Sequence, residues 1–239
     1  MNLSNLFQPR CSHRHTILEH KNCFNPDGTP KTLEQFITKE PKILLIDIET
    51  SLMIFSSFRT GKQYLSSTNI MEDYFVMAWS AKWLGEPKVF SDVLTSKEAV
   101  NKDDKRICKS IWKLLDEADA TISHNGDSFD FKKLNTRFVL HGLGLPRRYK
   151  SIDTLKLARL IFSFSSNKLD YICKFLGLEG KSDNNGYDTW LECLKGNKVE
   201  LDMLSEYNKN DVVILENLYE ILKVGIITPL KQPKTGWKQ

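Results

Sequence analysis

Two patterns of hydrophobic positions divide this chain into short and long segments. Short apolar runs are typical of buried strands, and they occur at residues 43–50, 75–84, 87–91 and 120–123. Apolar residues repeat every three or four positions in the segments that predict helices, at 96–119, 127–141, 152–162, 168–176, 189–194 and 199–222. Strands come first and then alternate with helices, so the order predicts an α/β fold with a mixed central sheet and helices on its faces.

The two ends of the chain differ from the middle. Asn25-Pro26-Asp27-Gly28-Thr29-Pro30 has the residues of a loop, and it follows a stretch with several cysteines and histidines. Residues 231–239 are polar and rich in lysine. We therefore predict an N-terminal Cys/His-containing arm at 1–40, the α/β domain at 41–225 and a polar tail at 226–239.

Composition narrows the class of protein. Of the 239 residues, 41% are hydrophobic and 27% are charged, so fibrous and fully disordered classes are excluded. No apolar run approaches the ~20 residues that span a bilayer, and the N-terminus does not have the pattern of a signal peptide. The five cysteines are an odd number, which favours reduced thiols. We therefore expect a cytoplasmic protein without a membrane partner, and its net charge of +4 neither requires nor opposes nucleic acid.

The first strand carries two carboxylates on one face. Side chains alternate along a strand, so Ile43, Leu45, Asp47 and Glu49 point to the same side. Two such carboxylates at the end of a buried strand repel each other, and a divalent cation removes that cost. Oxygen ligands suit Mg²⁺ or Mn²⁺. The alternative, which the pair alone favours, is that Glu49 lies just beyond the strand in solvent.

Two later helices also place an acid on an apolar stripe. Asp130 shares a helix face with Leu134 and Phe138. An acid in a first turn complements the helix dipole, but that does not explain its place among apolar residues. Asp211 lies near the centre of the apolar stripe of the last helix, with Tyr207 one turn before it. A buried carboxylate needs a partner, and a metal ion is one that serves several carboxylates at once.

The ordered set of these motifs resembles the DEDD 3′–5′ exonucleases, the proofreading branch of the ribonuclease H-like superfamily. Asp47-Ile48-Glu49-Thr50 is similar to their first motif, and Asn125-Gly126-Asp127-Ser128-Phe129-Asp130 to the second, N-x3-F-D. Tyr207-Asn208-Lys209-Asn210-Asp211 is similar to the third, Y-x3-D, which marks the tyrosine (DEDDy) subclass. The resemblance covers roughly residues 42–222. Asp153-Thr154 and Lys168-Leu169-Asp170 further resemble stand-alone phage and bacterial relatives of the family B polymerase exonuclease domain.

The resemblance implies a ribonuclease H-like fold and a two-metal-ion mechanism. In that family the four carboxylates hold two Mg²⁺ or Mn²⁺ ions, and here these residues are Asp47, Glu49, Asp130 and Asp211. Tyr207 is implied to orient the attacking water, because a phenol with a pKa near ~10 is a poor base at neutral pH.

The implied ligand is single-stranded or 3′-ended nucleic acid, with DNA favoured. Thr50, Asn125 and Phe129 are the residues implied to bind this substrate. The chain is too short to include a polymerase domain, so proofreading would need a separate polymerase or replication protein as partner. A phage-encoded member would act in the host cytoplasm.

Two alternatives remain open at this stage. An exoribonuclease would share every metal ligand, and the sequence contains no feature that reads a 2′-hydroxyl. A catalytically silent nucleic-acid-binding module would have the same fold, but such relatives usually lose a ligand and none is missing here.

The N-terminal arm contains a second candidate metal site. Cys11, His15, His20 and Cys23 could bind one Zn²⁺ tetrahedrally, although the spacing C-x3-H-x4-H-x2-C is not a common finger spacing. The alternatives are a surface histidine cluster and a helix-turn-helix-like arm whose basic residues touch phosphate.

Overall fold

The computed structural model describes residues 23–30, 41–64, 66–178 and 186–227, with side chains as far as residue 223. The chain falls into two compact units, Met1–Pro41 and Lys42–Gln239. In the first unit, a bridge between Phe24 and Pro30 closes the predicted loop, with Gly28 in the left-handed region at φ 82°. None of the described helices combines the length and the apolar character needed to cross a bilayer.

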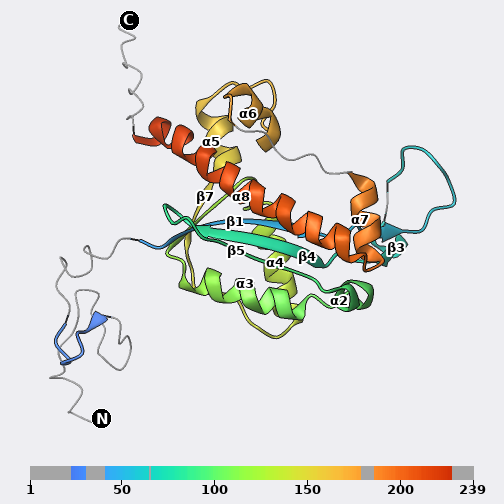
Figure 1. Ribbon diagram of the computed structural model, residues 1–239, viewed down its shortest axis with the longest axis horizontal. Helices are drawn as coiled ribbons and strands as arrows, with labels where there is room; N and C mark the ends of the chain where they lie inside the picture. The colour runs from blue at the N-terminus through green and yellow to red at the C-terminus, as the bar shows by residue number, and fades with distance from the viewer. Residues whose placement is uncertain (1–22, 31–40, 65, 179–185, 228–239) are drawn as a thin grey trace, which may run out of the picture. The chain divides into compact units, whose positions relative to one another are not determined.

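The second unit is built on one five-stranded mixed sheet with the order β5-β4-β1-β6-β7. Its strands are β1 (Ile43–Thr50), β4 (Val76–Trp83), β5 (Val89–Val93), β6 (Ala120–Ser123) and β7 (Lys150–Asp153). β1 lies at the centre, antiparallel to β4 and parallel to β6. Because helices flank this sheet (Figure 1), the predicted α/β class with a mixed central sheet is confirmed.

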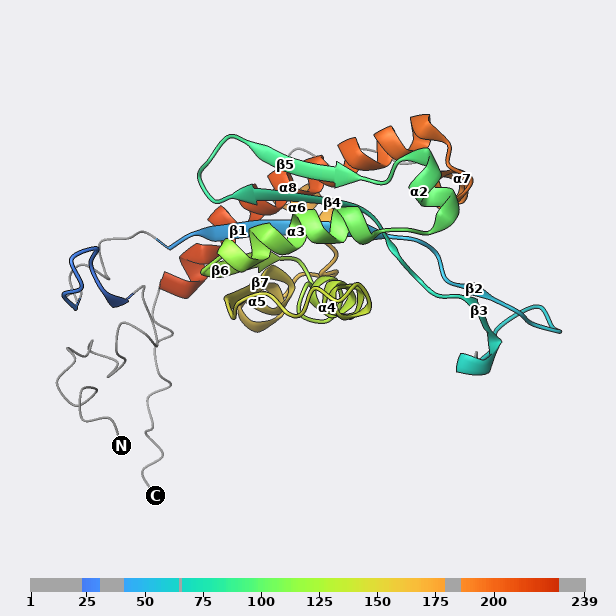
Figure 2. The same cartoon turned by 90° about the horizontal axis from the view of Figure 1, so that it is seen from below.

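Helices cover both faces of the sheet. They are α2 (Ser96–Asn101), α3 (Lys105–Glu117), α4 (Asp130–Leu140), α5 (Thr154–Ile161), α6 (Leu169–Phe175), α7 (Tyr187–Leu194) and α8 (Lys198–Ile227). In Figures 1 and 2, α8 runs along one face of the sheet, and α3 and α4 lie on the other.

The alternation of side chains along β1 divides the core between these two layers. Leu44 and Ile46 belong to the cluster that includes the buried side chains of α3 and α4. Leu45, one position along, packs with Val212 and Leu215 of α8. Burial of each large apolar side chain contributes ~1.5–3 kcal/mol, so α8 is held firmly on the face that Asp47 and Glu49 share.

The boundaries of the predicted helices differ from those in the structure; the helix predicted from residue 127, for example, begins at Asp130. The segment predicted as one helix over 96–119 forms α2 and α3, because Lys102 adopts a left-handed conformation at φ 56°. Thr95 caps α2 through a capping box with Glu98. The segment predicted as a helix from residue 152 begins as the end of β7, and its helix starts at Thr154.

The chain between β1 and β4 forms an unpredicted two-stranded ribbon. It consists of β2 (Ile54–Phe55), the short 3₁₀ helix η3 (Ser67–Asn69) and β3 (Ile70–Glu72). The two strands pair antiparallel, and no strand of the main sheet joins them. The strands are too short to have shown an alternating pattern in the sequence.

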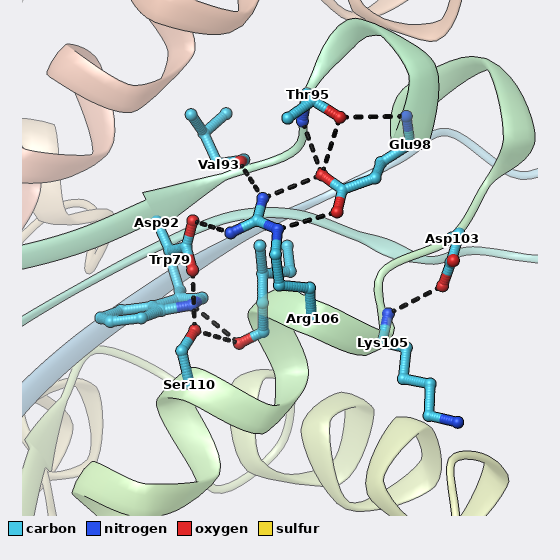
Figure 3. A network of polar contacts seen from close by, with 10 residues as sticks. Trp79, Asp92, Val93, Thr95, Glu98, Asp103, Lys105, Arg106 and Ser110 are labelled. Carbon is cyan, nitrogen blue, oxygen red and sulfur yellow. Dashed lines mark hydrogen bonds and ion pairs between the residues drawn. The ribbon is translucent and has the colours of Figure 1, made fainter.

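Arg106 links β5, α2 and α3 through the network drawn in Figure 3. Its guanidinium donates to Glu98 Oε1 at 2.8 Å, to Asp92 Oδ1 at 2.6 Å and to the Val93 carbonyl at 2.8 Å. The hydrogen bond from Arg106 is the main reason that the pKa of Glu98 is lowered to about 2. These contacts fasten the edge of the sheet to α3.

Asp104 links α3, α4 and β4 from a fully buried position. Its carboxylate accepts from Arg137 Nε at 2.7 Å and Nη2 at 2.6 Å, and from the Val76 amide at 2.8 Å. His141 Nε2 lies 2.6 Å from the same carboxylate. Burial alone would raise the pKa of Asp104, but the hydrogen bonds from Arg137, Val76 and His141 outweigh it and lower this pKa.

We predict that Asp104→Asn destabilises the fold by about 3–5 kcal/mol, because it leaves the half-buried Arg137 without its anion. The Asp104 carboxylate stabilises the folded state above its ordinary pKa of 3.8, and this stabilisation is lost as the pH falls through the lowered folded-state pKa. Urea unfolding between pH 7 and pH 3 measures both effects.

The matched control is Asp202→Asn, which removes one charge from an exposed pair with Lys198 on α8. It should change the free energy of unfolding little. Equal unfolding midpoints for the two variants would show that the Asp104 network does not stabilise the fold.

Candidate active site

Three carboxylates from two distant parts of the chain meet at the end of β1. Asp47 and Glu49 come from β1, and Asp211 comes from α8. Each offers an oxygen that lies within 4.8 Å of the other two. Asp211 is buried, whereas Asp47 and Glu49 are partly exposed, so the cluster opens toward solvent on one side.

Local structure explains why these three side chains converge. Asp47 and Glu49 continue the β1 face on which Leu45 packs against α8. On α8, the buried positions Leu204, Asn208, Asp211 and Leu215 follow one another at helical spacing. The apolar members of this stripe fix the rotation of the helix, and Asp211 is therefore turned toward β1.

Asn208 is a site residue that the sequence reasoning missed. It is fully buried, and its Nδ2 donates to Asp47 Oδ2 at 2.6 Å. This hydrogen bond fixes the orientation of one carboxylate of the cluster. The available signal was a second polar residue on the apolar stripe of the last helix, one turn before Asp211.

Asp130 lies against the same strand but outside the cluster of three. It is the first residue of α4, it is buried, and its Oδ1 accepts a hydrogen bond from the Ile48 amide at 3.2 Å. Burial is the main reason that its pKa is raised to about 7, and the charge of Asp153 adds to this. Asp130 thus joins α4 to β1 at Ile48, the residue between Asp47 and Glu49. With this pKa, its carboxyl can gain or lose a proton near neutral pH.

Tyr207 lies four residues before Asp211 on α8 and is partly buried. Residues four apart on a helix are neighbours on its surface. Its predicted role, to face a bound phosphodiester, stays a prediction.

Thr50 and Phe129 are connected by one lysine. Lys133 Nζ donates to Thr50 Oγ1 at 3.2 Å and lies 4.6 Å from the centre of the Phe129 ring. The same ammonium is 3.9 Å from the ring of Tyr74. The Thr50 carbonyl also accepts from Trp190 Nε1 at 3.1 Å, so the chain just after Glu49 is held on two sides.

Asn125 lies in the turn that leads from β6 to α4. It adopts a left-handed conformation at φ 70°, and its amide donates to Asp153 Oδ1 at 2.9 Å. Its carbonyl accepts from the amides of Ser128 and Phe129, which sets the start of α4 and hence the place of Asp130. Asn125 also lines a cleft of about 620 Å³ that includes the basic residues Arg159 and Lys168.

His124 has a structural position next to this turn. Its Nδ1 lies 2.9 Å from Thr154 Oγ1, and its Nε2 lies 2.9 Å from the Asn167 carbonyl. Both ring nitrogens thus have partners, and these contacts tie the turn after β6 to the start of α5 and to the chain at Asn167.

Comparisons with known proteins agree with this architecture. The family model described as the RNase_H superfamily matches residues 85–223, more than half of the chain. The chain belongs to the RNase H superfamily. The matched region includes Asp130 and Asp211, and the ribonuclease H-like fold expected from the sequence is confirmed.

Two polymerases are among the similar proteins. The PolC-type DNA polymerase III of Ureaplasma parvum serovar 3 is 38% identical over 81 residues, which are 33% of this chain and 6% of that protein. The structure of the family B DNA polymerase from the archaeon Pyrobaculum calidifontis matches 82% of this chain and 25% of that chain, with a TM-score of 0.56 and 16% identity. This RNase H superfamily chain therefore corresponds to a small part of each polymerase, and the second likeness is one of fold.

The donor set of the RNase H superfamily site fits a divalent metal ion. Three carboxylates within 4.8 Å of one another repel when ionised, and a cation of Mg²⁺ or Mn²⁺ type relieves this repulsion. The Asp130 carboxylate lies against the Ile48 amide and is not one of these three. The structure thus provides acidic side chains able to hold such ions.

A second cluster of potential ligands does not fit a metal ion. Asp104, Cys108 and His141 also lie within 4.8 Å of one another. Arg137 already occupies this cluster with its guanidinium, and burial raises the pKa of the Cys108 thiol. A thiol that keeps its proton beside a fixed cation is a poor ligand, so this cluster is structural.

The N-terminal candidate site lies largely outside the described residues. Cys11, His15 and His20 are not described, and Cys23 is described and buried. The Zn²⁺ site therefore stays a prediction.

We predict that Asn208→Leu weakens binding of Mn²⁺ to the carboxylate cluster by about 10- to 100-fold, because Asp47 loses the donor that orients it. Isothermal titration calorimetry on metal-free protein measures the change. Asn101→Ala, on an exposed position of α2, is the control and should leave the affinity unchanged. An unchanged affinity in Asn208→Leu would mean that this hydrogen bond does not shape the site.

Proposed function

We propose that residues 41–225 form a metal-dependent 3′–5′ exonuclease domain of the DEDDy type that hydrolyses phosphodiester bonds of nucleic acid, with DNA favoured. One observation carries this proposal: Asp47, Glu49 and Asp211 meet within 4.8 Å at the end of the central strand. Membership of the RNase H superfamily and the likeness to two DNA polymerases support it.

The four acidic residues share one role, which is to hold the metal ions. Asp47, Glu49, Asp130 and Asp211 would hold two Mg²⁺ or Mn²⁺ ions. When bound, such a pair of ions stabilises charge on both the attacking and the leaving oxygen of an in-line displacement. Burial raises the pKa of Asp130 to about 7, so its carboxyl would release its proton to solvent when a cation binds.

The remaining residues position the reactants. Tyr207 orients the attacking water by a hydrogen bond to its Oη, because a phenol, with an ordinary pKa near ~10, is a poor base at neutral pH. Phe129, which is partly exposed at the start of α4, offers a ring against the terminal nucleotide. Thr50 and Asn125 border the substrate site, because they lie where β1 and β6 lead into turns.

Two alternatives differ from this proposal in substrate or in activity. An exoribonuclease would use the same carboxylates on RNA. A silent nucleic-acid-binding module would bind the strand without cutting it, and the presence of all four acids argues against it. The similar proteins are named as DNA polymerases, which supports DNA as the substrate and a separate polymerase as the partner. We propose that the protein acts in the cytoplasm, as expected from the sequence.

The direct test is degradation of oligonucleotides labelled at the 3′ or the 5′ end. Single- and double-stranded DNA and RNA are compared with Mg²⁺, with Mn²⁺ and with chelator. The proposal expects early release of the 3′ label from DNA, only with metal. Release from RNA alone would favour the exoribonuclease, and binding without cleavage would favour the silent module.

We predict different effects for the tyrosine and the acids. Tyr207→Phe should keep the fold and metal binding but slow hydrolysis by ~10²–10³-fold, as expected for one positioning hydrogen bond. Asp211→Asn and Asp47→Asn should slow it more, because metal binding is lost with the carboxylate. Single-turnover cleavage of a 3′-labelled oligonucleotide measures all three rates.

The comparison has two informative contrary results. Full activity of Tyr207→Phe beside an inactive Asp211→Asn would make the tyrosine a packing residue and remove the basis for the DEDDy subclass. Full activity of all three variants would end the metal-nuclease proposal.

We also propose that Cys11, His15, His20 and Cys23 bind one Zn²⁺ in the N-terminal arm. Elemental analysis of protein purified without chelator should find one zinc per chain, and Cys11→Ser should remove it. Cys173→Ser, a buried cysteine of α6, is the control and should retain it. Protein without zinc would leave the arm as a basic docking segment.

A further inference from the structure

The ribbon between β1 and β4 carries an unusual surface at its tip. We call residues 56–69 the ribbon tip; they connect β2 to β3 and include η3. Phe58 and Tyr64 are fully exposed there, at 107% and 101% of their reference areas. Exposure of two large rings to water at one place has a cost in free energy unless a ligand covers them.

The charge of the ribbon tip has one sign. Arg59 and Lys62 lie between the two aromatic residues, and the sequence has no Asp or Glu from Thr50 to Met71. Within the described part of the chain, neither Arg59 nor Lys62 takes part in an ion pair. Both cations are therefore available to an external anion.

Other polar side chains of the tip are used to hold its backbone. Ser57 Oγ donates to the Arg59 carbonyl at 3.0 Å, and the Gln63 side chain bonds both of these residues. Ser66 and Asn69 form a capping box around η3. The backbone is thus held by these side chains, while the two rings and the two cations are exposed.

The root of the ribbon lies beside the carboxylate cluster. The chain enters the ribbon a few residues after Thr50, since β2 begins at Ile54. Ser51 and Phe75 close the base: the Ser51 amide donates to the Phe75 carbonyl at 2.9 Å, and Ser51 Oγ accepts from the Phe75 amide at 3.0 Å. Lys102 pairs with Glu72 at 2.5 Å and connects β3 to the end of α2. Figure 2 shows β2 and β3 extending from the end of the sheet at which β1 ends. The strand end with Asp47 and Glu49 therefore leads directly into the ribbon.

We infer that the ribbon tip binds single-stranded nucleic acid, with Phe58 and Tyr64 stacking on bases and Arg59 and Lys62 contacting phosphates. Aromatic rings interleaved with cations, without acids, are the surface chemistry of single-strand binding. Binding of a protein partner would require neither the lack of acidic residues nor stacking of the rings. The inference rests on the proposed function, since it places the strand that enters the site on this ribbon.

The test measures binding of a fluorescent single-stranded oligonucleotide by anisotropy, in chelator so that no cleavage occurs. Phe58→Ala with Tyr64→Ala should weaken binding at least 10-fold, as expected for two lost stacking contacts. Phe58→Leu with Tyr64→Leu keeps apolar surface and should weaken it similarly. Arg59→Ala with Lys62→Ala should also weaken binding. The slope of log K against log salt concentration should become shallower by about 1.4, because each of the two lost phosphate contacts contributes ~0.7 to this slope.

The control removes two charges from exposed positions of α3, Lys109→Ala with Lys113→Ala, and should leave affinity and salt dependence nearly unchanged. All substituted side chains are exposed, so thermal unfolding should match that of the unaltered chain.

Three results would overturn the inference. Unchanged affinity in the alanine pair would mean that the rings do not bind the strand and are left for a protein partner, and unchanged affinity in the leucine pair would mean that apolar area rather than stacking supports binding. An equal loss in the α3 control would mean that charge anywhere on the protein sets the affinity. Because binding is read in chelator, failure of hydrolysis and failure of this inference are separate outcomes.

Discussion

Electrostatic repulsion among Asp47, Glu49 and Asp211 is the constraint around which this structure is arranged. Their oxygens lie within 4.8 Å of one another, and like charges that close disfavour the ionised state of the cluster. Packing has to hold them there: Leu45 of β1 packs against Val212 and Leu215 of α8 on the same face. The apolar contacts fix β1 and α8 against each other, and the repulsion between the carboxylates gives the site its affinity for cations.

The rest of the scaffold determines what surrounds this cluster. Asn125 sets the turn before α4, and α4 in turn places Asp130 against the Ile48 amide. Arg106 and Asp104 fasten the sheet edge and the opposite helix layer, so that β1 is held at the centre of the sheet. The helix layers on both faces of β1 thus contribute to the position of the acids, Asp211 from α8 and Asp130 from α4.

The sequence predicted site residues where an acidic side chain lies at a position that the periodic pattern assigns to an apolar face. Acids on apolar faces predicted Asp47, Glu49, Asp130 and Asp211 as site residues, and the structure gathers three of them, with Asp130 bonded to the strand between two of the others. Asn208 was missed because one amide on a helix stripe has no distinctive pattern. β7 was missed because its first residues are polar and exposed, and the ribbon because strands of two and three residues show no period. The break at Lys102 was missed because a left-handed conformation is uncommon for lysine.

Anomalous diffraction from crystals soaked in Mn²⁺ is the most direct measurement of the central claim. The account predicts manganese density between the carboxylates of Asp47, Glu49 and Asp211, with a second ion nearby that engages Asp130. Manganese bound only elsewhere on the protein, with these four side chains unchanged at saturating concentration, would contradict it.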